Sequence, residues 1–88
     1  MKVNVWFYGK FRELATRQRA VQLADDASLG DLMERLAQEY GMEFNHEMRR
    51  FEVYFIMVNG NYCNLSVNKE RPLEDGDVVA FVPIVEGG

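Results

Sequence analysis

The sequence has one cysteine and one histidine among its 88 residues, and this scarcity excludes several kinds of site. A disulfide framework or a thiolate metal cluster needs several cysteines, so the chain alone can build neither. The lack of disulfides fits a reducing compartment. Nothing in the sequence pairs His46 with Cys63 as base and nucleophile. We therefore expect Cys63 to be a small buried apolar residue and His46 to be a surface loop residue.

Long apolar runs and an excess of positive charge are also absent. No apolar run reaches membrane-spanning length, and the first residues, MKVNVWFYGK, lack the form of a signal peptide. We therefore expect a soluble, cytoplasmic protein without a membrane partner. The net charge of -4 disfavours binding to nucleic acid, because phosphate contacts need a basic surface. On net charge alone, the expected partner is a basic protein.

Motifs for catalysis and metal binding are missing as well. The seven glycines stand singly or as the final pair, and none forms a phosphate-binding loop. The acidic pairs Asp25-Asp26 and Asp75/Asp77 fall at expected turns, where aspartate is favoured for backbone reasons. We expect no metal site and no bound cofactor, and the chain alone is not expected to be an enzyme.

The apolar pattern predicts a small α+β domain with a mixed sheet and one main helix across one face. Alternating and continuous apolar stretches predict strands at residues 2–8, 19–23, 52–58, 62–65 and 78–82. Ser28 and Asp31 have the spacing of a capping box, so they predict the start of a helix that Gly41 ends. Asn59-Gly60 and Asp75-Gly76 predict turns.

Two segments remain open between alternatives. Residues 10–15 fit a loop or a single helical turn, and residues 42–50 fit a loop or a short helix. Alternation places Trp6, Tyr8, Ala80 and Val82 on the sheet face away from the helix, and Tyr62 is expected to join them. An apolar patch of this kind marks a docking surface. The alternative is that residues 42–51 fold over this face and bury it.

The chain ends in PIVEGG, and this ending has its own physical interpretation. We expect residues 1–82 to form the domain and residues 83–88 a tail that reaches roughly 20 Å beyond it. Pro83 would stiffen the exit and stay out of strand pairing. Gly87 and Gly88 have no side chains, so they could pass a narrow channel and present the terminal carboxylate inside another protein. The alternative for Gly-Gly is a frayed end.

The stretch PLEDGDVVAFVPIVEGG resembles the closing signature of the ubiquitin-related β-grasp sulfur carriers, most closely the small subunits of molybdopterin synthase. VWFYGKFREL, SLGDLMERLA and VNG resemble the family's first strand, helix and hairpin, so the resemblance covers nearly the whole chain. It implies the ubiquitin-like β-grasp fold. It also implies that Tyr8, Tyr62 and Val82 are docking positions and that Pro83, Ile84 and Val85 contact the partner.

The resemblance further implies a chemistry. An adenylyltransferase of the ubiquitin-activating type would use ATP to adenylate Gly88, and the product would become a thiocarboxylate. The charged tail would enter the large subunit of molybdopterin synthase, forming a heterotetramer, and would donate sulfur to build the dithiolene that holds molybdenum or tungsten. The chain would thus be the sulfur-donating subunit of a sulfurtransferase.

Two departures leave other functions open. Ile84 replaces the second proline of the family's usual pair, and residues 42–51 form a longer segment than in compact members, so a specialised paralogue is possible. The chain could instead carry sulfur for thiamine thiazole, although carriers of that pathway usually lack the Ala80-Phe81-Val82-Pro83 run. It could also be a protein modifier conjugated through Gly88, or an interaction domain without tail chemistry.

Overall fold

The computed structural model describes residues 1–50, 54–64 and 68–84, which form a five-stranded mixed sheet with helices on one face. The strands lie in the order β2-β1-β5-β3-β4. Their bounds are β1 (Lys2–Phe7), β2 (Gln18–Gln22), β3 (Tyr54–Val58), β4 (Asn61–Cys63) and β5 (Val78–Pro83). This arrangement confirms the predicted α+β class.

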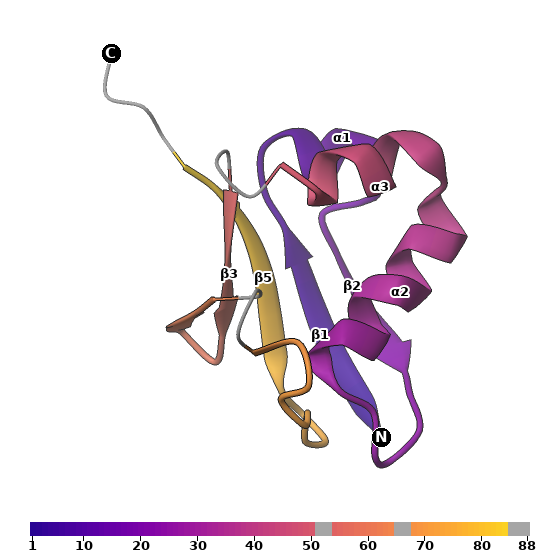
Figure 1. Ribbon diagram of the computed structural model, residues 1–88, viewed down its shortest axis with the longest axis vertical. Coiled ribbons are helices and arrows are strands. Elements are labelled where there is room, and N and C mark those ends of the chain that lie inside the picture. The colour runs from indigo at the N-terminus through magenta and orange to yellow at the C-terminus, as the bar shows by residue number, and fades with distance from the viewer. Residues whose placement is uncertain (51–53, 65–67, 85–88) are drawn as a thin grey trace.

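Strand β5 is the centre of the sheet, although it is the last strand in the sequence (Figure 1). It pairs in parallel with β1 and antiparallel with β3, and each of these strands forms an antiparallel hairpin with an edge strand. The β3–β4 turn contains Asn59 and Gly60 with φ of 51° and 82°, as the Asn-Gly signal predicts.

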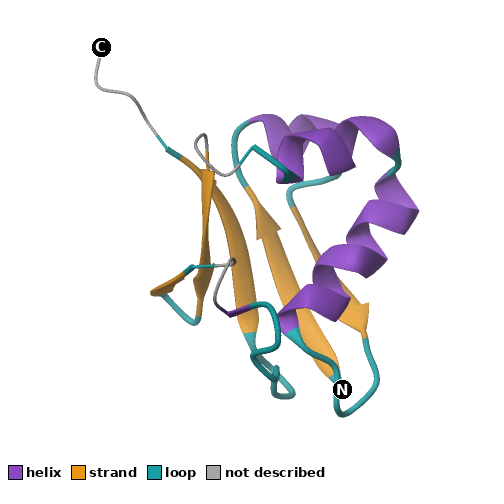
Figure 2. Ribbon diagram, in the orientation of Figure 1, coloured by secondary structure: helices purple, strands orange, loops and turns teal. Residues whose placement is uncertain are grey.

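Helices α1 (Lys10–Leu14), α2 (Leu29–Tyr40) and α3 (Met42–Met48) lie on the same side of the sheet (Figure 2). The predicted capping box of α2 is present: the Asp31 backbone N–H donates to Ser28 Oγ at 3.2 Å, and the Ser28 N–H donates to Asp31 Oδ2 at 2.9 Å. Gly41 ends α2 with φ of 87°. The structure also decides the two open alternatives: residues 10–15 contain helix α1 and residues 42–50 contain helix α3, so neither segment is a loop throughout.

Helix α3 corrects two expectations. It packs on the core face, where the fully buried Phe44 ring lies 5.9 Å from Phe7 and 5.4 Å from Phe11. The suggestion that residues 42–51 cover the opposite face is therefore wrong for the described part of that segment, and residues 51–53 lie outside the described residues. His46 is exposed as expected, but it lies on α3 and not in a loop.

The core is aromatic where the helices meet the sheet. Phe7 and Phe81, neighbours across β1 and β5, stack with ring centroids 5.5 Å apart. Tyr54 of β3 packs edge-on against Phe11 at 4.8 Å. Cys63 is buried, as predicted. Aromatic pairs of this geometry stabilise a core beyond their area burial, so the three helices are fixed on one face.

Gly30 lies in the first turn of α2 because a neighbouring segment approaches it closely. Its backbone N–H donates to the Lys69 carbonyl at 2.8 Å, and a Cβ at this position would lie 2.9 Å from that oxygen. The glycine reduces helix propensity, but it allows this contact between α2 and the segment that precedes β5.

The observed strand ends differ slightly from the predicted ones. Strand β2 begins one residue earlier than expected, and β4 ends at Cys63, whereas residue 65 lies outside the described part. Strand β5 runs one residue further, to Pro83, which pairs with Tyr54 of β3. The expectation that Pro83 stays out of strand pairing is therefore wrong. A proline is tolerated at such a strand end because its carbonyl can still accept.

Candidate functional site

The candidate site is the sheet face that α1, α2 and α3 leave uncovered. Alternation along each strand sends one set of side chains into the core and the other set outward. The outward side chains of β5, β3 and β4 are apolar, and Trp6 of β1 and Tyr8 directly after β1 join them, whereas Lys2 and Asn4 of β1 are polar. We call the apolar set the apolar outer face; it consists of Trp6, Tyr8, Phe55, Met57, Tyr62, Val78, Ala80 and Val82. A solvated sheet face would carry polar residues here.

The strand register places these side chains in rows across the sheet. Trp6 pairs with Ala80, Ala80 pairs with Met57, and Met57 pairs with Tyr62, so one row crosses four strands. In the next row Phe55 pairs with Val82, and the rings of Phe55 and Tyr62 lie 5.9 Å apart. The face is therefore one continuous surface.

This surface is accessible and slightly concave. Trp6 is 39% and Tyr62 64% exposed, which is high for large apolar side chains. A hollow of about 240 Å³ lies between β1, β5 and β3, lined by Trp6, Tyr8, Met57, Gly60, Val78 and Ala80. A contiguous apolar surface of this kind on a small domain is typical of a protein-docking site.

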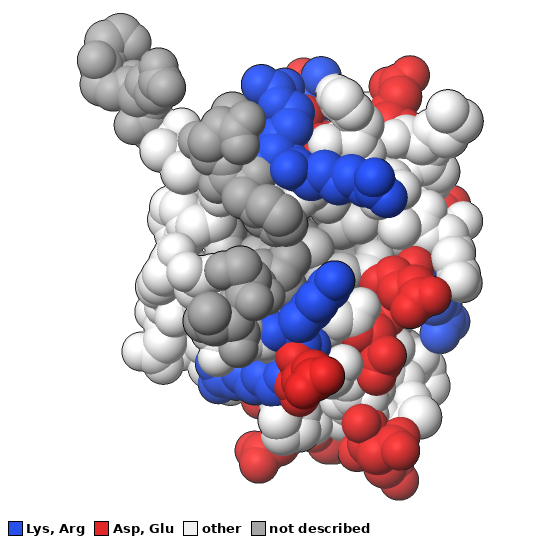
Figure 3. All heavy atoms as spheres, viewed as in Figure 1, with Lys and Arg blue, Asp and Glu red and all other residues white. Residues whose placement is uncertain are grey.

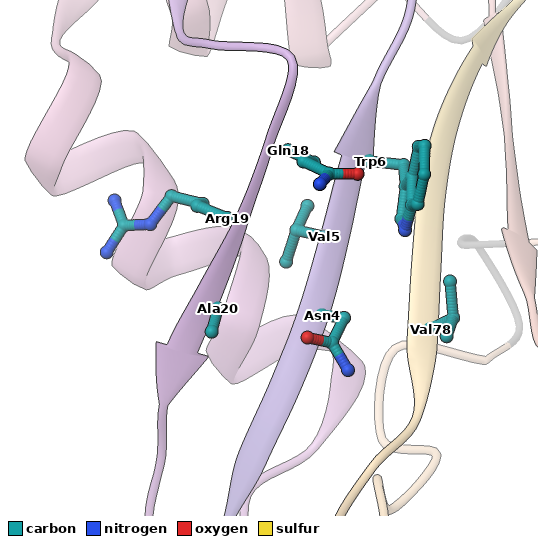
Figure 4. Close-up of a pocket in the computed structure, with 7 residues that line it drawn as sticks. All are labelled: Asn4, Val5, Trp6, Gln18, Arg19, Ala20 and Val78. Carbon is teal, nitrogen blue, oxygen red and sulfur yellow. The ribbon is translucent and has the colours of Figure 1, made fainter.

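The apolar outer face ends at β1. A second hollow, of about 380 Å³, lies between β1 and β2 beside Trp6, and Figure 4 shows the polar side chains of Asn4 and Gln18 in it. Arg19 points away from this hollow toward α2, where its guanidinium donates to Glu39 Oε2 at 2.8 Å and to Tyr40 Oη at 3.1 Å. The polar β2 side is therefore suited to form the rim of an interface and the β5 side its centre.

The end of β5 is held by the β1–α1 connection. The Tyr8 backbone N–H donates to the Phe81 carbonyl at 3.1 Å, and Gly9 lies so close to Pro83 that a Cβ there would be 3.0 Å from Pro83 Cγ. Arg12 donates from Nε to the Phe7 carbonyl at 3.3 Å, and its guanidinium lies 5.4 Å from the centre of the Tyr8 ring. These contacts fix the point from which the chain leaves the sheet.

The structure brings most of the predicted site residues together. Trp6, Tyr8, Tyr62, Ala80 and Val82 share the apolar outer face, as alternation predicts. Pro83 ends β5, and Ile84 directly after it is exposed. Val85, Gly87 and Gly88 lie outside the described residues, so the tail stays a prediction.

Sequence reasoning missed two members of the face, Phe55 and Met57, whereas alternation in β5 places Val78 on the same side as Ala80 and Val82. The signal was present, because Tyr54, Ile56 and Val58 are buried while Phe55 and Met57 alternate with them. The continuous apolar run predicts a strand buried on both sides, which hides that alternation.

The described residues hold no catalytic constellation that we can identify. No group of three or more His, Cys, Asp or Glu side chains within them could hold a metal ion. Cys63 is buried, and Arg71 Nη1 lies 3.8 Å from its sulfur. In the same described part of the chain, no helix is long and apolar enough to span a membrane.

The Asp75/Asp77 pair serves the backbone, as predicted, whereas Asp25 forms an ion pair with the N-terminal ammonium at 2.9 Å. Asp75 Oδ1 accepts from the Lys2 backbone N–H at 2.7 Å. Asp77 accepts from the Glu74 backbone N–H at 2.8 Å and from the Asn59 side-chain amide at 2.9 Å. The DGD sequence therefore organises the turn into β5 and links it to β1 and to the β3–β4 turn.

One carboxylate is largely buried. Glu47 of α3 is 7% exposed, and Arg50 Nη1 lies 3.3 Å and Lys10 Nζ 4.0 Å from its Oε1. Nearby, the Tyr54 hydroxyl donates to the Met48 carbonyl. Burial, with a smaller contribution from Glu47, raises the pKa of Tyr54 well above its usual range. This group joins α1, α3 and β3 beside the end of β5.

Comparison with known proteins agrees with this architecture. The described residues have the ubiquitin-like β-grasp fold: small archaeal modifier protein 1 from H. volcanii superposes with a TM-score of 0.73, at 22% identity, over 96% of this chain and 98% of that chain. Residues 5–88 match the ThiS family. The chain belongs to this family and is a sulfur carrier of the ThiS type.

Two relatives resemble this chain over its whole length. The molybdopterin synthase sulfur carrier subunit of Mycobacterium tuberculosis is 34% identical over 90 residues, covering 100% of this chain and 99% of that protein. A chain from the complex of subunits 1 and 2 of the molybdopterin-converting factor of Helicobacter pylori is 31% identical. It has a TM-score of 0.65 and covers 100% of both chains.

Proposed function

We propose that this chain is the sulfur-donating small subunit of a molybdopterin synthase, with Gly88 as the residue that carries sulfur. The observation that carries the proposal is the full-length similarity to the M. tuberculosis sulfur carrier subunit, at 34% identity. The apolar outer face supports it, because a carrier without catalytic groups of its own has to dock on enzymes. We expect the protein to act in the cytoplasm.

The proposed chemistry takes place at the Gly88 carboxylate. One carboxylate oxygen attacks the α-phosphorus of ATP on an activating enzyme of the ubiquitin-activating type, and pyrophosphate leaves. Hydrosulfide then attacks the acyl carbon, the bond to the phosphate oxygen breaks so that AMP leaves, and a thiocarboxylate remains. In this proposal the chain binds no cofactor, and ATP belongs to the partner.

The partner that accepts the sulfur would be the large subunit of the synthase, in a heterotetramer. The Helicobacter structure is a complex of subunits 1 and 2, and this chain resembles one of its chains at 31% identity. In our proposal the row from Trp6 to Tyr62 forms the centre of the interface. Pro83, Ile84 and Val85 would lead Gly87 and Gly88 to the acceptor site.

The family match supports a second candidate. Because residues 5–88 match the ThiS family, a carrier for thiamine thiazole formation remains the alternative acceptor pathway. Both pathways share adenylation and the thiocarboxylate, so only the acceptor distinguishes them. Incubating the thiocarboxylate form separately with each acceptor enzyme would do so, with product formation as the readout.

The first experiment is the intact mass of the chain purified from cells that contain its activating enzyme. Replacement of one oxygen by sulfur, localised to Gly88 by fragmentation, is the expected result. A carboxylate mass, together with Gly88 in isopeptide linkage to lysines of other proteins, would contradict it and identify a protein modifier. The matched control is the same chain from cells that lack the activating enzyme, which should show the carboxylate alone.

A further inference from the structure

The described charges are separated between the two ends of the molecule. The tail-side end, where β5 finishes, carries Lys10, Arg12, Arg17, Arg49 and Arg50. Three contacts place the backbones of these residues at one end: Gly9 lies against Pro83, and the Arg17 carbonyl accepts from the Phe7 N–H at 2.9 Å. Tyr54, which pairs with Pro83, donates from its hydroxyl to the Met48 carbonyl at the end of α3.

The opposite end is acidic. The segments 24–31 and 70–77, which meet at the bridge between Ser28 and Pro72, carry seven carboxylates: Asp25, Asp26, Asp31, Glu70, Glu74, Asp75 and Asp77. On the face drawn in Figure 3, basic side chains gather around the end of α3 and acidic ones are most frequent toward the far end, with side chains of both signs between them.

Formal charges give the size of the separation. Segments 8–17 and 41–50 hold five basic and three acidic side chains, a net of +2. Segments 24–31 and 69–77, with the Met1 ammonium and Lys2 that contact Asp25 and Asp75, hold seven acidic and four basic groups, a net of -3. The net charge of -4 therefore hides a positive tail-side end. Such a distribution orients a protein in the field of a charged partner.

Two basic side chains at the tail-side end form no ion pair within the described residues. Lys10 and Arg50 form ion pairs with the carboxylate of the buried Glu47. Arg17 and Arg49 are exposed, and neither forms an ion pair with a described carboxylate. Their charges are available to a partner that approaches from the tail side.

We propose that the basic tail-side end steers this chain onto an acidic surface that borders the tail-accepting channel of its activating enzyme. The acidic far end would be repelled by the same surface, so the encounter would favour the orientation that brings β5 toward the channel. This inference rests on the proposed function. Net charge alone predicts a basic partner, whereas the charge distribution predicts a partner whose docking surface is acidic.

The test compares two double variants of equal net charge. Arg17→Glu with Arg49→Glu reverses two charges at the tail-side end, and Lys2→Glu with Lys69→Glu reverses two charges elsewhere. Both changes leave the Glu47 ion pairs and the apolar outer face intact. Association rate constants with the cognate activating enzyme would be measured by stopped flow at about 10 mM salt, where the Debye length is about 30 Å, and at about 1 M, where it is about 3 Å.

We expect the tail-side variant to associate about tenfold more slowly than the parent at low salt. The Lys2/Lys69 variant should change much less, and the two variants should converge at high salt. Thermal unfolding midpoints would confirm that both fold. Equal slowing of the two variants at low salt, or a difference that persists at 1 M salt, would overturn the steering proposal.

Failure of the proposed function would look different. The parent chain at saturating concentration should support ATP–pyrophosphate exchange by the activating enzyme, and removal of Gly88 should abolish that exchange. Absence of exchange with the parent would refute adenylation of the tail, whereas normal exchange with equal association rates for both variants would refute only the steering.

Discussion

Tyr54 and Pro83 face each other at the last pair of the β3–β5 ladder, and the Tyr54 hydroxyl donates to the Met48 carbonyl of α3. The last pair in the sheet before the tail is thus fastened to a helix on the core side. Gly9, which contacts Pro83, holds the same point from the β1 side. The start of the tail is therefore fixed by three separate segments of the chain.

Replacing Tyr54 by phenylalanine should lower the free energy of unfolding by about 1 kcal/mol at neutral pH, because the hydroxyl donor to Met48 is lost. The pH dependence should also change. Burial raises the pKa of Tyr54, so above about pH 10 the unfolded chain releases this proton while the folded chain keeps it. The parent therefore loses stability as the pH rises above about 10, and the phenylalanine variant loses less.

The measurement is urea unfolding of both proteins at several pH values between about 8 and 11. Tyr62→Phe is the matched control, because Tyr62 is exposed and should change neither the stability nor the slope. Parallel curves for the parent and Tyr54→Phe would contradict the raised pKa.

Gly30→Ala should destabilise the protein, although alanine is the better helix former by about 1 kcal/mol. The new Cβ would lie 2.9 Å from the Lys69 carbonyl oxygen, so the backbone would have to move. Overpacking of this kind costs about 1–3 kcal/mol. Chemical unfolding of Gly30→Ala beside Glu34→Ala, an exposed site on the same helix, measures the effect. A gain in stability for Gly30→Ala would refute the contact.

Tyr62→Asp and Val82→Asp should each weaken binding to the large synthase subunit by about 30-fold or more, because each places a charge in the centre of an apolar interface. The matched control is Gln18→Asp, which lies on the same sheet face opposite Trp6 but on the polar β2 side. Isothermal titration calorimetry gives the affinities. Equal losses for Gln18→Asp would move the interface toward β2.

Deletion of Gly88 should abolish thiocarboxylate formation and leave the thermal unfolding midpoint within about 1 °C of the parent, because loss of a chain end outside the core has little effect on stability. The described core extends from Val3 to Phe81. Intact mass after incubation with ATP, activating enzyme and a sulfur source is the readout. Sulfur incorporation by the shortened chain would refute the role of Gly88.

The sequence predicts those parts of the fold that depend on local chemistry. The Ser28–Asp31 capping box, the Asn59-Gly60 turn and the alternation in β1 and β5 act within a few residues, and each is confirmed. The apolar outer face follows from that alternation, because the side-chain period of a strand fixes which residues share a side.

The rest depends on contacts between distant residues. Helix α3 is short and of mixed composition, and Phe44 fixes it by packing against Phe7 and Phe11, which no local pattern shows. The outward position of Met57 depends on pairing with Ala80 and Tyr62 across two ladders. Gly30 and Lys69 lie close together although they are almost forty positions apart in the sequence. Helix propensity alone would therefore predict that replacing Gly30 by alanine stabilises the protein.

The central position of β5 also determines how the domain responds to force. A pull on the end of β5 acts along the strand, parallel to β1 and antiparallel to β3, so the hydrogen bonds of both ladders are loaded together in shear. A terminal strand at a sheet edge would instead peel away one pair at a time. We therefore expect the domain to resist extraction by its C-terminus more strongly than it would if β5 lay at an edge of the sheet.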